Sequence, residues 1–208
     1  MRMKPVPDIV VGRLPLYLRA LGQMKAEGNT VTSSHELARR LGISSAQIRK
    51  DLSQFGEFGK QGTGYNIAFL QEQIQRILGV DRTWDVAVVG IGDLGRALAH
   101  YAGFLQRGFQ ICALYDNDPA KIGQKVRDLT IQSMDVMGVD IRRKNIRIAM
   151  LAVPLSFAQE VADELIKAGV VAILNYAPTS IKAPEGVRVQ QIDPALHLQH
   201  MTYYIKPD

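Results

Sequence analysis

The hydrophobic period of the chain changes near residue 80, and this change limits the possible folds more than any other feature. Before it, apolar residues recur at helical spacing; after it, short β-branched runs alternate with helical segments. Strands that alternate with helices indicate a parallel sheet covered by helices. We therefore expect a helical domain over residues 1–79, an α/β domain over 80–192 and a terminal helix over 193–208.

A glycine motif joins the first strand of the α/β domain to its first helix. The sequence GIGDLG at residues 90–95 follows the apolar run DVAVV and opens a helical segment. In this context the first glycine makes a tight turn, the second lets the backbone approach a pyrophosphate, and the third lets the helix pack on the strand. The helix N-terminus offers free amides to phosphates. The motif predicts a Rossmann domain that binds a dinucleotide through Gly90, Ile91, Gly92, Asp93, Leu94 and Gly95.

Asp116 ends the next strand, where a carboxylate should bond the ribose hydroxyls of the adenosine half. Because the same carboxylate would repel a 2′-phosphate, we predict NAD(H) rather than NADP(H). The alternative is a turn residue within DNDPAKIG, since Asp and Asn favour turns. Ligands of open α/β sheets bind beyond the carboxyl ends of the strands. Further candidate cofactor-binding residues there are Asn117, Lys121, Val153, Pro154, Asn175, Ala177 and Pro178.

The first domain has the element order of a winged helix-turn-helix. A first helix is expected over about 8–27, with a kink near Pro15. Capping boxes at Ser33 and Ser44 open a short second helix and a polar third helix. The four glycines of FGEFGKQGTGY suit a tight hairpin, and a fourth helix should cover residues 67–78.

The polar third helix is the expected recognition helix. Only Ile48 and Leu52 recur at core spacing, so the rest of its surface should face solvent or a charged partner. Glutamine can pair with adenine, and arginine or lysine with guanine, while a wing would touch phosphate or the minor groove. The candidate DNA contacts are Arg13, Ser44, Gln47, Arg49, Lys50, Ser53, Lys60 and Gln61.

Charge is distributed unevenly between the two parts of the chain. The formal net charge is +5, and residues 1–80 contain 11 of the 25 Lys and Arg but only 6 of the 20 Asp and Glu, so the remainder is balanced. A basic unit beside a neutral one favours a polyanion as the partner of the first. The alternative is a helical bundle for protein contacts, whose charges are merely solvated.

Little in the sequence favours catalysis, a metal or a membrane. None of the four histidines stands beside a carboxylate in a catalytic pattern, and the motifs HExxH, CxxC and GxSxG do not occur. We predict no enzyme and no metal site, with the nucleotide acting as a signal. No apolar run is long enough for a bilayer, and the single cysteine, Cys112, fits a reducing cytoplasm.

Taken together, these motifs resemble the Rex family of redox-sensing transcriptional repressors. The matching stretches follow in order over nearly the whole chain: RLPLYLRAL, SSAQIRKDLSQFGEFGKQGTGYN, VVGIGDLGRALAHYAGF, YDNDPAKIG, AVP and ILNYAP. The resemblance implies a homodimer that binds double-stranded operator DNA with NAD⁺ and releases it with NADH. It implies that the operator is read by Gln47, Arg49 and Lys50. It also implies a C-terminal helix swapped onto the partner subunit, and an interdomain relay formed by Arg19, Tyr101 and Asp193.

The C-terminal helix also has signals of its own. Asp193 can cap it, and Pro194 suits its first position. Its apolar face, which includes Leu198 and Met201, must be buried somewhere, and packing on its own subunit is the alternative to a swap. The chain departs from the family pattern at Pro194, where a large apolar residue is common, and at Asp93, where asparagine is. The first departure puts the nicotinamide contacts of that position in doubt.

An apolar nicotinamide pocket should prefer NADH, because the ring of NAD⁺ carries a positive charge. The expected walls are Tyr101, Phe104, Ala177 and Pro178. A rotation between subunits would spoil the spacing of about 34–36 Å that two recognition helices need. Two other functions stay open: an NAD-dependent oxidoreductase with an N-terminal helical arm, and a nucleotide-binding interaction module that touches no DNA.

Overall fold

The structure is a computed structural model that describes residues 6–59 and 64–205. The chain forms two compact units, Met1–Arg82 and Thr83–Asp208. The last helix of the first unit ends at Gly79, whose positive φ of 68° is a backbone conformation that glycine adopts without strain.

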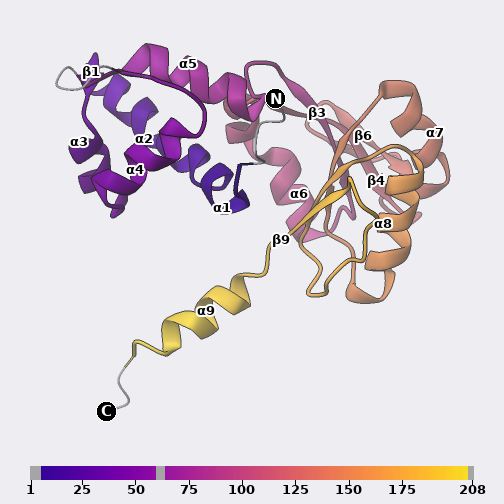
Figure 1. The fold of residues 1–208 in the computed structure, drawn as a ribbon. Coiled ribbons are helices and arrows are strands. Elements are labelled where there is room, and N and C mark those ends of the chain that lie inside the picture. The colour runs from indigo at the N-terminus through magenta and orange to yellow at the C-terminus, as the bar shows by residue number, and fades with distance from the viewer. Residues whose placement is uncertain (1–5, 60–63, 206–208) are drawn as a thin grey trace. The chain divides into compact units, whose positions relative to one another are not determined.

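The first unit is built from helices and one short antiparallel strand pair (Figure 1). The helices are α1 (Asp8–Val11), α2 (Leu14–Ala26), α3 (Ser34–Leu41), α4 (Ser45–Ser53) and α5 (Ile67–Leu78). The strands are β1 (Val31–Thr32) and β2 (Tyr65–Asn66), which pair with each other. The apolar faces of α2 to α5 form one core, which includes Leu14, Leu21, Leu37, Ile48, Leu70 and Ile74.

The expected caps of the second and third helices are confirmed, whereas the expected first helix is wrong in form. The side chains of Ser33 and Ser44 accept hydrogen bonds from the amides three residues ahead. The chain breaks between α1 and α2 at residues 12–13, and Pro15 lies in the first turn of α2, not at a kink. A proline is tolerated there because the first helical amides have no intrahelical partner.

The glycine-rich segment after α4 does not form a self-paired hairpin in its described part. Its returning end, β2, pairs with β1 between α2 and α3. The two ends of the segment still approach each other, since a Cβ on Gly59 would lie 2.6 Å from the carbonyl oxygen of Gly64. Lys60 and Gln61, the expected wing contacts, lie outside the described residues.

The second unit is a seven-stranded sheet in the order β5-β6-β4-β3-β7-β8-β9. All neighbouring strands are parallel except β5 and β6. The strands are β3 (Trp84–Val89), β4 (Phe109–Asp116), β5 (Lys125–Val126), β6 (Leu129–Ser133), β7 (Ile148–Leu151), β8 (Ala172–Asn175) and β9 (Arg188–Gln191). The helices are α6 (Asp93–His100), α7 (Met134–Lys144), α8 (Ala158–Lys167) and α9 (Pro194–Thr202), with 3₁₀ turns η1 (Ala102–Arg107) and η2 (Leu155–Phe157).

Helices cover both faces of this sheet, so the Rossmann prediction is confirmed. On one face, Met137 of α7 and Leu165 of α8 pack against the strands. On the other face, Ala99 of α6 and Phe104 of η1 do so. The chain leaves β3 for β4 on one side and reaches β7 on the other, so strand order reverses beside β3. Such a reversal is where open α/β sheets bind ligands.

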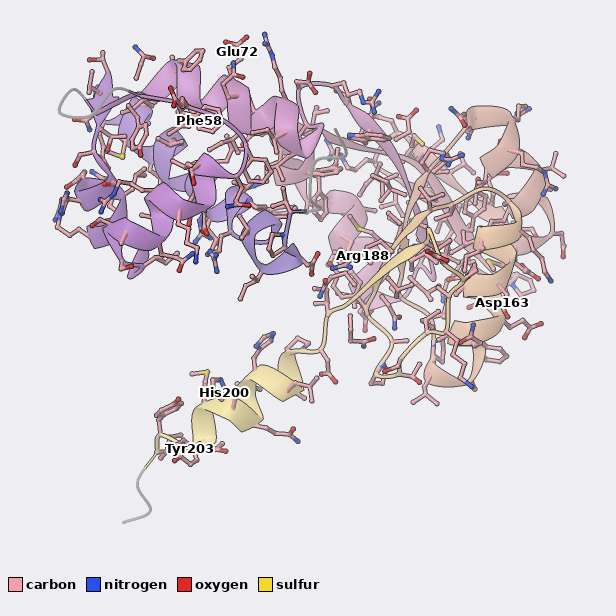
Figure 2. All side chains as sticks on the ribbon, viewed as in Figure 1. Phe58, Glu72, Asp163, Arg188, His200 and Tyr203 are labelled. Carbon is pink, nitrogen blue, oxygen red and sulfur yellow. The ribbon has the colours of Figure 1, made fainter. Side chains whose placement is uncertain are left out.

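Two helices differ from expectation. The sequence DLGRALAHYAGFL predicts one helix over residues 93–105, but the helix ends at His100, because Tyr101 takes an extended backbone (ψ 103°), and the chain continues as η1. Helix α9 has the expected cap, since the Asp193 carboxylate accepts from the amide of Ala195. However, every residue from 194 to 205 is exposed, His200 and Tyr203 among them (Figure 2).

Candidate functional site

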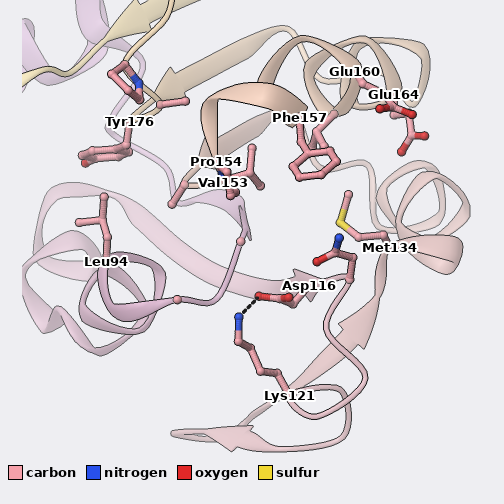
Figure 3. Close-up of a pocket in the computed structure, with 17 residues that line it drawn as sticks. Leu94, Asp116, Lys121, Met134, Val153, Pro154, Phe157, Glu160, Glu164 and Tyr176 are labelled. Carbon is pink, nitrogen blue, oxygen red and sulfur yellow. Dashed lines mark hydrogen bonds and ion pairs between the residues drawn. The ribbon is translucent and has the colours of Figure 1, made fainter.

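A cavity of about 610 Å³ lies at the carboxyl ends of the central strands (Figure 3). Its walls come from the loops after β3, β4, β7 and β8 and from the start of α8. These loops meet here because parallel strands place their carboxyl ends at the same edge of a sheet. A volume between about 300 and 1,000 Å³ is typical of sites for small molecules and cofactors.

The three motif glycines occupy positions where other residues would clash or fill the cavity. Gly90 has a φ of 88°, and a Cβ there would lie 2.5 Å from the carbonyl oxygen of Ala152. A Cβ on Gly95 would lie 1.9 Å from the carbonyl oxygen of Gly90, so only glycine lets α6 begin so close to β3. Gly92 lines the cavity and has open space at its Cβ position. The loop and the N-terminus of α6 therefore leave room for a pyrophosphate.

Asp116 is almost fully buried at the end of β4 and faces the cavity (Figure 3). Its carboxylate accepts from the amides of Ile91 (2.7 Å) and Asp118 (2.9 Å) and from the ammonium of Lys121 (3.2 Å). Burial alone would raise the pKa of this carboxyl, but the hydrogen bonds outweigh it and hold the pKa below its ordinary value. The group is thus an ionised acceptor, and about one of its four lone-pair sites is left for a ligand hydroxyl.

The structure brings most of the predicted cofactor residues to one cavity. The lining includes ten of them: Gly90, Gly92, Leu94, Asp116, Asn117, Lys121, Val153, Pro154, Ala177 and Pro178. Four others are not among the lining residues: Ile91 and Gly95 are buried beneath the glycine loop, Asn175 is buried beneath the loop after β8, and Asp93 is exposed at the start of α6. These four therefore support the loops or flank them.

Sequence reasoning missed one side of the cavity. Its remaining lining residues are Met134, Ala152, Phe157, Glu160, Val161, Glu164 and Tyr176. Met134 opens α7, a helix that the hydrophobic pattern did not indicate. The sequence SFAQEVADELIKAG predicts a helix that contains Phe157, Glu160 and Glu164 but gives these residues no role. The first turn after a strand at the switch point is nevertheless a signal for ligand contact.

Two of the four expected nicotinamide walls are displaced from the cavity. Ala177 and Pro178 line it, but Tyr101 and Phe104 are not among its lining residues. These two rings instead pack edge to face with their centroids 4.9 Å apart, and the Tyr101 hydroxyl accepts a long hydrogen bond from Arg107. The break of the helix at Tyr101 directs the η1 turn to the face of the sheet that carries α6.

The three residues of the expected relay lie on different elements. Arg19 is exposed on α2 in the first unit. Tyr101 is 51% exposed after α6, and Asp193 caps α9. The carboxylate of Asp193 is thus already engaged by a backbone amide of its own helix.

Helix α4, which the sequence predicts to be the recognition helix, contains a buried carboxylate that the sequence analysis did not single out. Asp51 is fully buried and accepts two hydrogen bonds from Arg13 (2.5 and 2.7 Å), one from the Tyr17 hydroxyl (2.6 Å) and one from the Gln47 amide (2.7 Å). Burial would raise the pKa of Asp51, but these donors lower it overall. Arg13 and Gln47, two of the candidate DNA contacts, are thus also partners of Asp51, because a buried charge requires paired donors.

The other described candidate DNA contacts lie on α4 or at its N-terminal cap and are exposed. Arg49 and Lys50 are exposed, and Arg49 donates to the Ser34 hydroxyl (2.9 Å). Ser53 donates to the carbonyl oxygen of Lys50, and Ser44 caps the helix. The helix thus presents two adjacent cationic side chains, Arg49 at its middle and Lys50 in its last turn.

The described residues contain no group of three or more His, Cys, Asp or Glu side chains that could hold a metal ion. Within residues 6–59 and 64–205, no helix is long and apolar enough to cross a membrane.

In the comparison with known proteins, two families match parts of the chain. The family described as "Putative DNA-binding protein N-terminus" matches residues 5–53, and the "CoA binding domain" family matches residues 81–179. The first range lies within the first unit, and the second lies within the second unit except for its first two residues, 81 and 82.

Relatives match the chain over its whole length. A redox-sensing transcriptional repressor Rex of Roseiflexus sp. (strain RS-1) is 53% identical over 207 residues, which cover 100% of this chain and 94% of the relative. The Rex protein of Carboxydothermus hydrogenoformans is 42% identical over 203 residues, 98% of each chain.

Solved structures agree with these relatives. The crystal structure of RSP in complex with beta-NAD⁺ and operator DNA is similar with a TM-score of 0.92 at 35% identity, covering 97% of this chain and 93% of that one. RSP, described elsewhere as a Rex-family repressor, is also similar in its complex with beta-NADH, with a TM-score of 0.88 at 33% identity over 97% and 94% of the two chains. The expectation of a regulator rather than an enzyme is thereby confirmed, and the chain belongs to the Rex family of redox-sensing transcriptional repressors.

Proposed function

We propose that this protein binds operator DNA as a homodimer and that NADH, held in the cavity of the α/β unit, releases it. The observation that carries the proposal is the combination in one chain of a polar, exposed α4 with a cavity formed by the GIGDLG loop and Asp116. The similarity to RSP, whose complexes with operator DNA and with NADH have been solved, supports both halves.

The DNA half rests on the surface of α4. Lys50 is exposed, and Arg49 keeps donors besides the one it gives to Ser34, so both can contact bases or phosphates in the major groove. Gln47 gives one amide hydrogen to Asp51 and keeps the other, together with its oxygen, for a base. One donor and one acceptor side by side match adenine. Arg13 positions α4 through Asp51, and Ser44 and Ser53 flank the contact.

The nucleotide half rests on the cavity. Gly92 and the N-terminus of α6 suit the pyrophosphate, and Asp116 suits the ribose hydroxyls and repels a 2′-phosphate. The loops after β7 and β8 supply apolar walls, which favour an uncharged nicotinamide over a cationic one. When bound, the dinucleotide supplies a nicotinamide ring whose charge depends on its redox state. The apolar walls of the cavity distinguish the two redox forms by that charge.

The homodimer rests on α9. A nine-residue helix is marginal on its own, and this one exposes Leu196, Leu198 and Met201, each by 58% or more. A second copy of the chain supplies a complementary surface, and two α4 helices about 34–36 Å apart then meet successive major grooves. We also infer a cytoplasmic location, since a lone cysteine suits a reducing compartment.

The test is fluorescence anisotropy of a labelled palindromic duplex mixed with the full chain. Binding is measured in three conditions: without nucleotide, with NAD⁺ and with NADH. Release by NADH but not by NAD⁺ is expected. Binding that ignores the redox form would overturn the proposal, and turnover of the cofactor with small alcohols or acids would favour an oxidoreductase.

A pair of variants locates the DNA contact. Lys50→Ala should weaken binding and reduce the slope of log affinity against log salt by about one. Lys25→Ala is the matched control, because Lys25 is an exposed lysine at the end of α2. Equal effects of the two changes would remove α4 from the reading surface.

A further inference from the structure

Two amide side chains, a buried one and a half-buried one, connect the cavity to the start of α9. We propose that Asn175 and Gln191 are positioning residues that transmit occupancy of the nucleotide cavity to the C-terminal helix. The proposal rests on the proposed function for the identity of the ligand. It concerns two residues that are not among the cavity's lining residues.

The two side chains are neighbours across the last strand pair of the sheet. Asn175 ends β8 and Gln191 ends β9, and they are paired in the parallel register. The Asn175 amide donates to the Gln191 side-chain oxygen (2.7 Å), and the Gln191 amide donates to the carbonyl oxygen of Ala177 (2.6 Å). Asn175 in turn accepts from the amide of Ala177 (3.0 Å). The three residues therefore form a closed ring of hydrogen bonds.

Every polar atom of the Asn175 side chain is engaged. Its second amide hydrogen goes to the carbonyl oxygen of Thr179 (2.7 Å), and the residue is fully buried. Donors and acceptors alternate around the ring, so neither amide can flip without facing donor to donor. Buried networks that are fully satisfied are rigid, and a displaced member must carry its partners with it.

One end of this ring is the wall of the cavity. Tyr176, Ala177 and Pro178 all line it, and Ala177 is held through both its amide and its carbonyl group. A ligand that displaces this loop therefore also displaces the hydrogen-bonded ring.

The other end of the ring is the start of α9. Gln191 lies two residues before Asp193, whose carboxylate caps that helix. The backbone adds a parallel link, because the amide of Ile192 donates to the carbonyl oxygen of Asn175 (2.8 Å). Movement of the loop after β8 is thus transmitted to the start of α9 through consecutive hydrogen bonds.

Gln191→Met tests the ring, because methionine keeps the length of the side chain and removes both hydrogen bonds. Gln191→Glu is the second variant: its carboxylate can still accept from Asn175 but cannot donate to Ala177. Gln190→Met is the matched control, since Gln190 is the exposed neighbour on the same strand.

Two readouts separate coupling from folding and from the proposed function. Hydrogen exchange of residues 193–205 should change on NADH addition in the native chain and in Gln190→Met, and should change little in either Gln191 variant. The ratio of operator affinities without and with NADH should fall by about tenfold in the Gln191 variants, the usual effect of a lost buried hydrogen bond. The operator affinity without NADH should stay within about twofold.

The outcomes are distinct. A native chain whose operator binding ignores NADH refutes the proposed function. If the native chain releases DNA on NADH addition, two results overturn the role of the ring alone. One is that hydrogen exchange of α9 does not change with NADH. The other is that the Gln191 variants respond to NADH as strongly as Gln190→Met.

Discussion

Asp51→Ala should destabilise the helical unit far more than any surface change, and the structure indicates how much. The carboxylate is fully buried between α2 and α4 and serves three donors. The substitution leaves the Arg13 guanidinium without its counterion and the buried Tyr17 hydroxyl without an acceptor. Both groups lie more than 30 residues away in sequence, so no local turn can replace the carboxylate.

Removing one member of a buried ion pair typically costs about 3–5 kcal/mol. The Arg13 side chain is 19% exposed, so water can solvate part of its charge, whereas Tyr17 is fully buried. We therefore expect the lower end of the range, about 3 kcal/mol. For a unit of this size, each kcal/mol corresponds to roughly 4–8 °C, which predicts a loss of about 12–24 °C in the midpoint of the helical unit.

The single tryptophan makes the assay selective. Trp84 lies in β3, so its fluorescence follows the α/β unit, while far-ultraviolet circular dichroism follows the helices of both units. In full-length Asp51→Ala, an early dichroism transition should separate from the tryptophan transition.

Glu72→Ala is the control for this measurement. Glu72 forms an exposed pair with Arg76, and such pairs contribute about 0–1 kcal/mol. If the dichroism midpoint of Asp51→Ala moves no further than that of Glu72→Ala, the network does not hold α4 in place.

Three further changes test the α/β unit. Gly95→Ala should abolish NADH binding because its Cβ would lie 1.9 Å from the oxygen of Gly90, whereas Gly92→Ala should fold normally and only weaken binding; calorimetry and dichroism that rank them the other way would contradict the loop geometry. Asp116→Ser should raise the affinity for NADPH relative to NADH by about tenfold or more, since a repelling carboxylate is removed; an unchanged preference by calorimetry would contradict its role. Burial would raise the pKa of Asp140, but its hydrogen-bond donors lower the pKa to about 2. The ionised carboxylate therefore stabilises the fold above about pH 4, and this contribution is lost as the pH falls towards 2. Asp140→Asn should make the tryptophan-monitored stability fall less steeply with acid, and an equally steep fall would contradict this.

The parts of the fold that the sequence predicted are those in which local chemistry dictates conformation. Ser33 and Ser44 cap helices because their hydroxyls satisfy amides three residues ahead, a local effect. Asp116 was placed correctly because the glycine loop fixes which strand comes next beside it. In each case one short segment contains the whole signal.

The parts that were missed depend on contacts between distant segments. Helix α7 was not predicted because Gly138, in its middle, weakens the helical pattern of the sequence. Its inward face also includes an aspartate, Asp140, which accepts a hydrogen bond from Tyr115 of β4. Strand β9 alternates Val189 with polar residues at a sheet edge, so its pattern is weak. A signal for Asp51 did exist: it lies three residues after Ile48, on the face of α4 that packs into the core.

The C-terminal helix joins the two proposals. Strand β9 ends at Gln191, and two residues later Asp193 caps a helix that exposes its apolar side chains. If that helix docks on a second copy, the hydrogen-bonded ring of one subunit governs a surface that belongs to the other. A ligand that displaces the loop after β8 then alters the dimer, not only its own subunit. Coupling free energies are reciprocal, so operator DNA should in turn lower the affinity of the cavity for NADH, and it should do so less in Gln191→Met than in the native chain.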